Sequence, residues 1–577
     1  MGINARLIFA TTAIEQTWGR DEDLLFLGEW CKVYSRKEIW QRRSYQTQEF
    51  HWSDRTKLAR DHDYLKELYE RVLRWLTIEL NRIHNVNHSE RYWRIVIGPW
   101  LITYIPVVWT RWEEITRVLD QNKSISTVVP INEVLSPIAD GYVQAQKLFF
   151  SDEWNYLLCL DIIKTLGSDQ VSFEKAPVTL KFDFLNKSKS SFKSKIGNFL
   201  DKFVGTFNLK NKYRVVIYDS YFPFLRLISI FLKIRQFPRL FRNLHFYPKT
   251  LNPDYDMRRK FSHFGLAGNE FEKFLSSKIP LDLPLAHVES YSNLNDCVVN
   301  LPTAKIIFTA SPFASESFKI WSATQVSSNA KFVASSHGGA LISRFAMFNH
   351  EEDISDLKTV WSKPFLDKHI QIAPNKINRN IQTSREKITL IGLELPRYPY
   401  RAHSGPTGPL MIKEIEQKFE FVSSLSDNSR KDFVFRPAPS AGWDTRQRFM
   451  DKFGKNILST GNTLIKDYKK SKLIICSYPQ TTFSEAMASG VPVILLYVES
   501  CWEFISLFDD LREVLSSAKV CFSDPKLAAE HVNNISDQPE VWWNSKDVFD
   551  ARKMFFELCV KKSNNPSSDW ANFFNGI

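Results

Sequence analysis

Short apolar segments that alternate with helical patterns constrain the fold of this chain more than any other feature. Each segment is rich in Val, Ile, Leu and Phe and ends near a turn residue or a charged residue. The clearest segments are 6–10, 24–27, 214–219, 305–310, 331–336, 387–392, 432–436, 472–477 and 491–497. Runs of this length and content are typical of buried strands. Strands separated by helices build parallel sheets, so we predict an α/β protein.

The segments between these strands suggest a division into domains. Apolar residues recur at helical spacing over 64–83, and Pro312 is expected at the first position of a further helix. The 577 residues exceed one ordinary core. We expect an N-terminal Rossmann-like domain with helical insertions over residues 1–320, a C-terminal nucleotide-binding Rossmann-like domain over 321–520, and a helical segment over 521–577.

The composition narrows the classes of function. The chain is 44% hydrophobic and 14% aromatic, which is typical of a globular protein. Its formal charge of +12 favours anionic partners such as nucleotides, but this charge is too dilute over 577 residues to indicate nucleic-acid binding. The seven cysteines form no C-x-x-C pair, so we predict reduced thiols rather than a zinc site or a disulfide framework.

No segment predicts a membrane span or a secretory leader. The N-terminus lacks the long apolar stretch of a signal peptide. The longest near-apolar run, 95–109, contains a glycine and two prolines and is shorter than the roughly 20 residues of a span. The apolar segment 221–237 is expected to form a buried helix, with lipid contact as the less favoured alternative. We therefore expect a cytoplasmic protein, with the cytoplasmic face of the inner membrane as a candidate location.

The strongest candidate for a ligand site is the segment YPQTTFSEAMASGVPVILLY, which begins at Tyr478. It places a helix start directly after a buried strand, and a helix N-terminus offers free amides and a positive dipole end to a phosphate. Thr481 and Thr482 can add hydroxyl donors there. Glu485, about one turn further on, can accept two hydrogen bonds from a ribose diol. The alternative is a capping box, in which Thr482 and Glu485 serve only their own helix.

Two other strand ends carry candidate ligand groups. His337, Gly338 and Gly339 follow the strand at 331–336, and paired glycines let the backbone approach a ligand closely. His337 can donate to a phosphate or act as an acid, although a turn with a structural histidine is the simpler interpretation. Arg436 ends the strand at 432–436, where ligands gather in α/β sheets, and a guanidinium can bind phosphate through two hydrogen bonds.

Four motifs in the first half add a family resemblance to these segments. They are FATTA (9–13) with Glu15 and Trp18, FLGEWC (26–31), YWRIVIGPWL (92–101) and YDSY (218–221). With the His-Gly-Gly loop and YPQTTFSE, they resemble, in the same order, a family of bacterial transferases of surface-carbohydrate and O-antigen biosynthesis. The resemblance spans residues 6–500. Ser336 stands where that family usually has Gln, and Ala340 stands where it often has a further Gly and Tyr.

The resemblance implies the GT-B fold, in which two Rossmann-like domains face a central cleft and C-terminal helices pack back. The segment EAMASGVPV looks like the donor signature of such glycosyltransferases, whose acidic residue, here Glu485, holds the nucleotide ribose. The His-Gly-Gly loop is similar to that of retaining β-Kdo transferases, in which a carboxylate of the N-terminal domain attacks the anomeric carbon. Asp219, at a strand end, is the candidate nucleophile, with Glu29 and Glu15 as alternatives. A helix cap is the structural alternative for Asp219.

The expected function is therefore transfer of a sugar from a nucleotide donor to a growing surface polysaccharide. A CMP-activated ulosonic acid such as Kdo is one candidate donor, and the acceptor is expected to be a glycan or a lipid-linked glycan. We expect no cofactor and no metal, because Arg436, His337 and helix amides can offset leaving-group charge. The D-x-D triplets at 21–23 and 61–63 are interpreted as surface. Alternatives are a polyol-phosphate transferase of the teichoic-acid type, a nucleotide-sugar epimerase and a non-catalytic glycan-binding scaffold.

Overall fold

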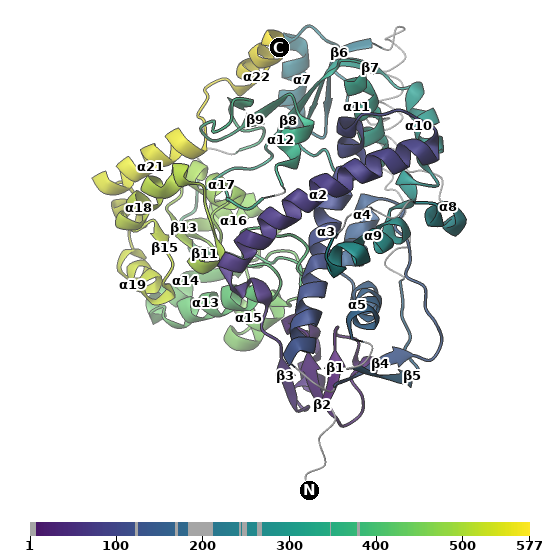
Figure 1. The fold of residues 1–577 in the computed structure, drawn as a ribbon. Helices are drawn as coiled ribbons and strands as arrows, with labels where there is room; N and C mark the ends of the chain where they lie inside the picture. Colours follow the sequence, from purple (N-terminus) through teal and green to yellow (C-terminus); the bar gives the residue numbers. More distant parts are fainter. Residues whose placement is uncertain are drawn as a thin grey trace.

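Three parallel sheets of five strands each organise the chain (Figure 1). The computed structural model describes residues 7–121, 125–167, 171–182, 212–241, 244, 251–261, 268–346, 348–377 and 381–577. The N-terminal sheet has the order β3 (Tyr45–Thr47), β2 (Asp23–Phe26), β1 (Leu7–Ala10), β4 (Ile125–Pro130) and β5 (Val171–Ala176). The middle sheet has the order β10 (His369–Gln371), β9 (Leu357–Val360), β8 (Lys331–Ser335), β7 (Thr303–Thr309) and β6 (Lys212–Tyr218). The C-terminal sheet has the order β12 (Phe433–Arg436), β11 (Lys387–Ile391), β13 (Ser471–Cys476), β14 (Val493–Leu496) and β15 (Cys521–Phe522).

Two long helices, α2 (Arg55–His84) and α3 (Glu90–Gln121), run between the N-terminal and middle sheets (Figure 1). The apolar run 95–109 lies inside α3, and Trp93 and Trp100 on this helix are fully buried. A helix that is apolar on all sides belongs in a core, so the tryptophans near this run serve packing. The other N-terminal helices are α1 (Lys37–Trp40), α4 (Tyr142–Phe149) and α5 (Asp152–Leu166).

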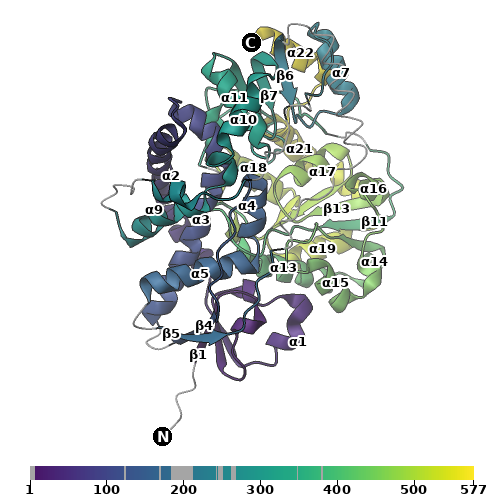
Figure 2. The same ribbon diagram turned by 90° about the vertical axis from the view of Figure 1, so that its right-hand side faces the viewer.

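Helices cover the other two sheets as the strand–helix alternation predicts (Figure 2). Those around the middle sheet are α7 (Phe224–Lys233), α8 (Tyr255–Arg259), α9 (Glu270–Asp282), α10 (Tyr291–Val299), α11 (Glu316–Ser327) and α12 (His350–Ile354). Those of the C-terminal unit are α13 (Met411–Ser423), α14 (Asp427–Asp432), α15 (Thr445–Phe453), α16 (Leu464–Lys470), α17 (Thr481–Ser489), α18 (Asp509–Ser517), α19 (Pro525–Ile535), α20 (Pro539–Trp543), α21 (Lys546–Cys559) and α22 (Pro566–Gly576).

The middle and C-terminal sheets face each other through the loops at their carboxyl ends. Ser343, in the loop after β8, forms an antiparallel bridge with Phe504, in the loop after β14. The last helix then returns to the middle sheet: Trp570 of α22 packs edge-on against Phe308 of β7, and its indole N–H donates to the carbonyl of Ala373 at 3.1 Å. This pair of facing Rossmann-like sheets with returning C-terminal helices confirms the predicted α/β, GT-B class.

The domain boundaries need revision. The expected boundary at 320/321 falls inside α11, between β7 and β8, which are paired in one sheet. The residues before it hold the complete N-terminal sheet and two strands of the middle sheet. The chain therefore has a third Rossmann-like unit in addition to the two that we predict.

Three smaller expectations also differ from the structure. Helix α11 begins at Glu316 rather than at Pro312, because the Ser315 side chain caps it by accepting from the Phe318 amide at 3.3 Å. Asp61, expected at the surface, is only 7% exposed. In α7, expected to be buried, only one face is buried, and Leu225 on its other face is 79% exposed. Across the described ranges, none of the helices combines the length and apolar content that crossing a bilayer requires.

Candidate active site between the middle and C-terminal sheets

The N-terminus of α17 lies at the position where α/β sheets commonly bind ligands. The strand order of the C-terminal sheet reverses between β11 and β13, and α17 follows β13 directly. Ligands of open α/β sheets bind outside the carboxyl ends of the strands at such a reversal. The N-cap is Gln480, and no side chain caps this end of the helix. The alternative interpretation, a capping box, does not apply, because Thr482 is the second helical residue instead of the cap.

Glu485 is placed to serve a ligand. Its side chain is partly exposed on the second turn of α17, on the same segment as the helix start. Burial raises the pKa of the Glu485 carboxyl, and the ammonium of Lys376 opposes that shift. Lys376 follows the middle sheet, so Glu485 lies near a charge from the facing sheet. A partly desolvated carboxylate in such a position is a candidate functional group.

Hydroxyl groups gather at the start of α17. The hydroxyl of Tyr478 is hydrogen-bonded to Oγ1 of Thr482, and the hydroxyl of Tyr468 donates to the Thr482 carbonyl at 3.4 Å. Thr482 is only 7% exposed, whereas Thr481 is partly exposed. Thr481 can therefore meet a ligand directly, while Thr482 holds Tyr478 in place.

The His-Gly-Gly loop packs directly on this helix start. A Cβ atom built on Gly338 would overlap Oγ1 of Thr481 and would lie 3.0 Å from Cβ of Thr481. A Cβ atom on Gly339 would lie 3.0 Å from two carbon atoms of Trp361. Gly338 therefore has no room for a side chain while Thr481 keeps its position, and Gly339 fits tightly against Trp361. The structure brings together Gly338 and Thr481, which lie 143 residues apart in the sequence.

Asp219 belongs to a loop that contacts the same region. It follows β6 with a φ of 43°, is exposed, and does not cap α7, whose N-cap is Pro223. Two residues later, the ring of Tyr221 stacks on the ring of His337 at a centroid distance of 5.5 Å. The negative charge of Asp219 contributes to the raised pKa of the Tyr221 hydroxyl, after burial as the main cause. Asp219 and His337 therefore stand on neighbouring loops at the carboxyl edge of the middle sheet.

Asn375 joins these loops, and no sequence pattern identifies it as a site residue. Its amide nitrogen donates to the carbonyl of Ser220 at 2.7 Å and lies 3.1 Å from Oγ of Ser335. The side chain is 1% exposed, so it fixes the Asp219 loop relative to the end of β8. Asn375 and Lys376 lie in the segment QIAPNK, which matches no motif; the only signal is their position just after a strand.

Arg436 is engaged in a different interaction from the one expected. It ends β12, but its Nη1 forms an ion pair with Asp467, which is 3% exposed, and donates to the carbonyl of Gly461 at 2.9 Å. Oγ of Ser459 donates to the same carboxylate. The guanidinium is therefore anchored to the protein, and only part of it faces outward.

The two alternative nucleophiles lie on the N-terminal sheet and are already paired. Glu15 forms an ion pair with Arg36 at 2.8 Å, and Glu29 forms one with Lys32 at 2.8 Å. The tryptophans of the same motifs have structural contacts: the indole N–H of Trp30 donates to the carbonyl of Thr11 at 3.0 Å. These N-terminal motifs therefore build the end of the N-terminal sheet.

One cluster in the described residues has the geometry of a metal site. Ligand atoms of His51, Asp61 and Glu113 lie within 4.8 Å of one another. The ammonium of Lys57, however, is 3.0 Å from Asp61 and 2.7 Å from Glu113. A cation of the protein itself thus pairs with both carboxylates, and we interpret the cluster as a core ion pair.

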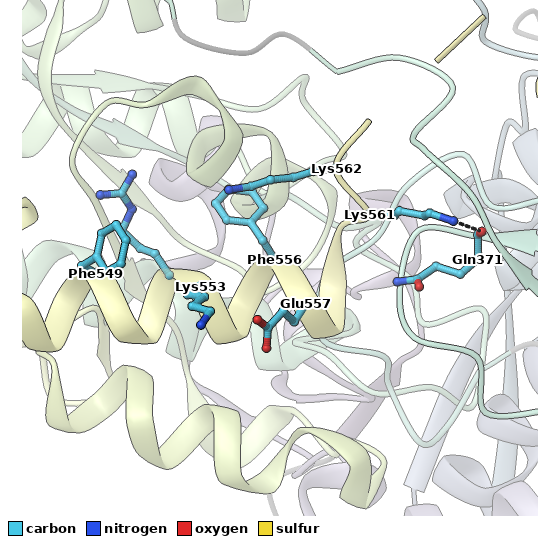
Figure 3. Close-up of a pocket in the computed structure, with 8 residues that line it drawn as sticks. Gln371, Phe549, Lys553, Phe556, Glu557, Lys561 and Lys562 are labelled. Atoms are coloured by element: carbon cyan, nitrogen blue, oxygen red, sulfur yellow. Dashed lines mark hydrogen bonds between the residues drawn. The ribbon is translucent and has the colours of Figure 1, made fainter. Parts of the chain in front are cut away.

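A basic groove along α21 lies apart from these residues (Figure 3). It has a volume of about 400 Å³ and is lined by Gln371, Phe549, Arg552, Lys553, Phe556, Glu557, Lys561 and Lys562. Nζ of Lys561 donates to the carbonyl of Gln371 at 3.2 Å, which closes one end of the groove. On its buried side, α21 supports α17, because Phe555 packs against Phe483 at 5.2 Å.

Comparisons with known proteins give a family match over almost the whole chain. The sequence model of the LIC12162 family transferase matches residues 7–574. No protein of curated description matches the sequence at a significant level. One similar solved structure is a putative UDP-N-acetylglucosamine 2-epimerase from Listeria monocytogenes, with 11% identity, coverage of 63% of this chain and 94% of that chain, and a TM-score of 0.35. A second is S. aureus MnaA with UDP, with 10% identity, coverage of 62% of this chain and 94% of that chain, and a TM-score of 0.35. A third is WaaG, a glycosyltransferase involved in lipopolysaccharide biosynthesis, with 10% identity, coverage of 63% of this chain and 100% of that chain, and a TM-score of 0.30.

Proposed function

Because the chain belongs to the LIC12162 family of transferases, we propose that it transfers a sugar from a nucleotide donor to a growing surface polysaccharide. The observation that carries the proposal is the contact between the two facing sheets at Gly338 and Thr481. It places a helix N-terminus without a side-chain cap, the Glu485 carboxylate and the His337 loop within one region. Each of these groups suits a different part of a nucleotide sugar.

The donor is proposed to bind across the start of α17. The amides and the Thr481 hydroxyl would take phosphate, because a helix N-terminus favours negative charge. Glu485 would accept from the ribose hydroxyls, since its carboxylate is partly exposed and the ammonium of Lys376 favours its charged form. His337 would offset the leaving-group charge as the bond to the phosphate breaks. A CMP-activated ulosonic acid such as Kdo is the donor that we favour.

Nucleotide binding is the direct test of this site. CMP, CDP, UDP, GDP and dTDP are added separately to the full chain, and the melting temperature is measured. We expect CMP to stabilise the native state, because a ligand that binds only the folded protein raises its melting temperature. Glu485→Ala should lower the affinity for that nucleotide at least about tenfold, because a charge-assisted hydrogen bond is lost. Glu530→Ala, which removes an exposed carboxylate of α19, should leave binding unchanged.

The same assay has a pH signature. The raised pKa of Glu485 means that its carboxylate protonates at a higher pH than that of an ordinary glutamate. Affinity should therefore fall more steeply on acidification in wild type than in Glu485→Ala, where only the nucleotide's own phosphate, with a second pKa of about 6, still titrates. If no nucleotide stabilises the wild-type chain, or if Glu485→Ala binds as tightly, the donor site is elsewhere. Preferential stabilisation by CDP would instead favour the polyol-phosphate transferase.

Asp219 is proposed to attack the anomeric carbon, and its substitution should affect rate rather than binding. Asp219→Asn should lower the turnover number by about a thousandfold while the nucleotide affinity stays within twofold, because the nucleophile acts mainly in the transition state. The measurement is release of nucleotide from the donor that the binding panel identifies. Glu15→Gln and Glu29→Gln are the comparators. An active Asp219→Asn combined with an inactive glutamate variant would reassign the nucleophile.

The acceptor is proposed to be lipid-linked, with the protein in peripheral contact with the membrane. Helix α7 begins three residues after Tyr221 and buries Ile230 and Phe231 on one face. Its other side and the following turn are apolar and exposed: Phe224 61%, Leu225 79%, Leu232 64% and Phe237 64%. Lys233 and Arg235 are exposed within this stretch and suit anionic headgroups. A bilayer on this face would present a lipid-linked sugar beside the Asp219 loop.

Vesicle binding tests the membrane contact. The full chain is sedimented with phosphatidylglycerol-containing vesicles and with pure phosphatidylcholine vesicles. We expect binding to the anionic vesicles, and a loss of at least about tenfold in Leu225→Glu/Leu232→Glu, because each leucine contributes roughly 1.5–3 kcal/mol when buried. Ile78→Glu is the matched control, since Ile78 is 66% exposed on α2. Equal sedimentation of the α7 variant and wild type would contradict the contact.

A further inference from the structure

Tyr221 is an exposed aromatic residue at the edge of the candidate site. It ends the YDSY motif and lies in the loop between β6 and α7. Its side chain is 48% exposed, whereas the next residue, Phe222, is 9% exposed and packs on the rings of Phe308 and Trp570. Phe222 therefore anchors the loop in the core, and the ring of Tyr221 lies on the outer side of the loop.

The backbone holds Tyr221 in an unusual conformation. Its φ is 60° and that of Asp219 is 43°, both in the left-handed region that residues with bulky side chains seldom adopt. Two contacts fix the loop: the Ala310 amide donates to the Asp219 carbonyl at 3.2 Å, and the Asn375 side chain donates to the Ser220 carbonyl at 2.7 Å. Strained positions persist only where surrounding contacts hold them, and they gather at ligand sites.

One face of the Tyr221 ring is covered and the other is accessible. The imidazole of His337 stacks on it with an interplanar angle of 21° and a centroid distance of 5.5 Å. Since about half of the side chain is exposed, the opposite face is open to a ligand. The hydroxyl stays protonated at neutral pH, because burial and then the charge of Asp219 raise its pKa. The open face is thus neutral and electron-rich, which suits the C–H groups of a sugar ring.

The groups along these loops follow the order of the parts of a nucleotide sugar. Gly338 contacts Thr481, where the phosphate is proposed to bind. His337 precedes Gly338, Tyr221 stacks on His337, and the proposed nucleophile Asp219 lies two residues before Tyr221. The sugar of a donor is bonded to the phosphate, so it must lie between the phosphate site and the nucleophile. Tyr221 is placed beside that position.

We propose that the open face of Tyr221 is the platform on which the transferred sugar stacks. This inference rests on the proposed glycosyl transfer and adds the residue that binds the sugar of the donor. An oxygen of Asp219 bonds to the anomeric carbon while the bond from that carbon to the phosphate oxygen breaks, and the electron pair leaves with the nucleotide. The anomeric centre gains positive charge in this transition state. The negative face of the ring stabilises that charge, so the platform contributes to rate as well as to binding.

The share of donor affinity that comes from the sugar tests the platform. Isothermal titration calorimetry on the full chain compares each nucleotide with its sugar-linked form: CMP with CMP-N-acetylneuraminate, UDP with UDP-N-acetylglucosamine, GDP with GDP-mannose and dTDP with dTDP-rhamnose. The ratio of the two dissociation constants measures the contribution of the sugar. For the sugar nucleotide that wild type binds most tightly, Tyr221→Leu should lower this ratio at least about fivefold, the effect of losing one aromatic contact.

Two variants control for the loss of the ring. Tyr221→Phe keeps the aromatic face and should hold the ratio within about twofold of wild type, because stacking needs the ring and not the hydroxyl. Tyr255→Leu replaces a 37% exposed tyrosine of α8 and should leave the ratio unchanged. Turnover should fall about tenfold in Tyr221→Leu and stay near wild type in Tyr221→Phe, because the charge on the anomeric carbon loses its partner only in the first variant.

The affinity for the nucleotide alone separates the platform from a structural role. It should stay within about twofold of wild type in Tyr221→Leu, because Thr481 and Glu485 are untouched. If nucleotide and sugar nucleotide lose affinity equally, the ring acts through His337 and the platform is overturned. An unchanged ratio in Tyr221→Leu also overturns it, as does a wild-type chain that binds every sugar nucleotide no more tightly than the nucleotide. If no nucleotide binds at all, the proposed donor site itself is overturned.

Discussion

Replacing Gly338 by valine should lower the turnover number at least about a hundredfold while leaving the protein folded. Any side chain at this position collides with Thr481, because a Cβ would overlap Oγ1 and lie 3.0–3.2 Å from the other two side-chain carbons. Thr481 is the first residue of α17, so either its side chain turns to another rotamer and takes the hydroxyl away from the phosphate site, or the loop and the helix start move apart. A displacement of about 1 Å in a catalytic geometry costs on the order of a hundredfold in rate. Turnover and melting temperature are measured together.

Two further variants show whether the loss comes from this contact. Gly576→Ala is the matched control, because a Cβ there meets nothing within 4 Å, and it should behave as wild type. Thr481→Ala removes the hydroxyl and the methyl group that the valine meets first. If the loss is steric, valine at 338 should cost less in the Thr481→Ala background than in wild type. Equal costs in both backgrounds would mean that the loop and α17 are not coupled.

The fold could be predicted from the strands that are buried on both faces. β11, β13 and β14 are continuous apolar runs because helices cover both sides of the sheet, and parallel strands of this kind are legible in a sequence. The missed strands differ in kind: β10 has three residues, β5 buries only Val171 fully and carries Glu174 and Lys175, and β4 is a six-residue strand that is mostly buried but contains Ser126, Thr127 and Pro130. β4 is an interior strand that joins β1 to β5, so missing it concealed the N-terminal sheet as a unit of its own.

The candidate site likewise has a part that the sequence predicts and a part that only the structure shows. Thr481, Glu485 and the two glycines lie in local patterns, a helix start and a strand-end turn, that the sequence displays directly. Their contact across the two sheets depends on tertiary packing, which no local pattern encodes. Asn375 illustrates the limit, because its importance comes from hydrogen bonds to Ser220 and Ser335, 155 and 40 residues away.

Arg436 ends a strand where the sequence predicts phosphate binding, but in the structure it pairs with Asp467. Its substitution should therefore lower the stability of the protein. Arg436→Met should lower the free energy of unfolding by about 3–5 kcal/mol, because the buried carboxylate of Asp467 would lose its cation. Urea unfolding followed by tryptophan fluorescence measures this change. Arg436→Met/Asp467→Asn should recover most of the loss, since neither charge is then left alone. Lys472→Met is the matched control, because Lys472 pairs with Asp432, whose side chain is 41% exposed.

The outcome also decides how Arg436 takes part in donor binding. Asp467 and the carbonyl of Gly461 both use Nη1, so the rest of the guanidinium is left to face outward at the end of β12. If the ion pair with Asp467 is its main role, the double variant should regain stability and still bind the nucleotide within about fivefold of wild type, because a surface-type contact is worth at most about 1 kcal/mol. If Arg436→Met instead keeps its stability and loses nucleotide binding, the guanidinium belongs to the donor pocket and Asp467 serves to orient it.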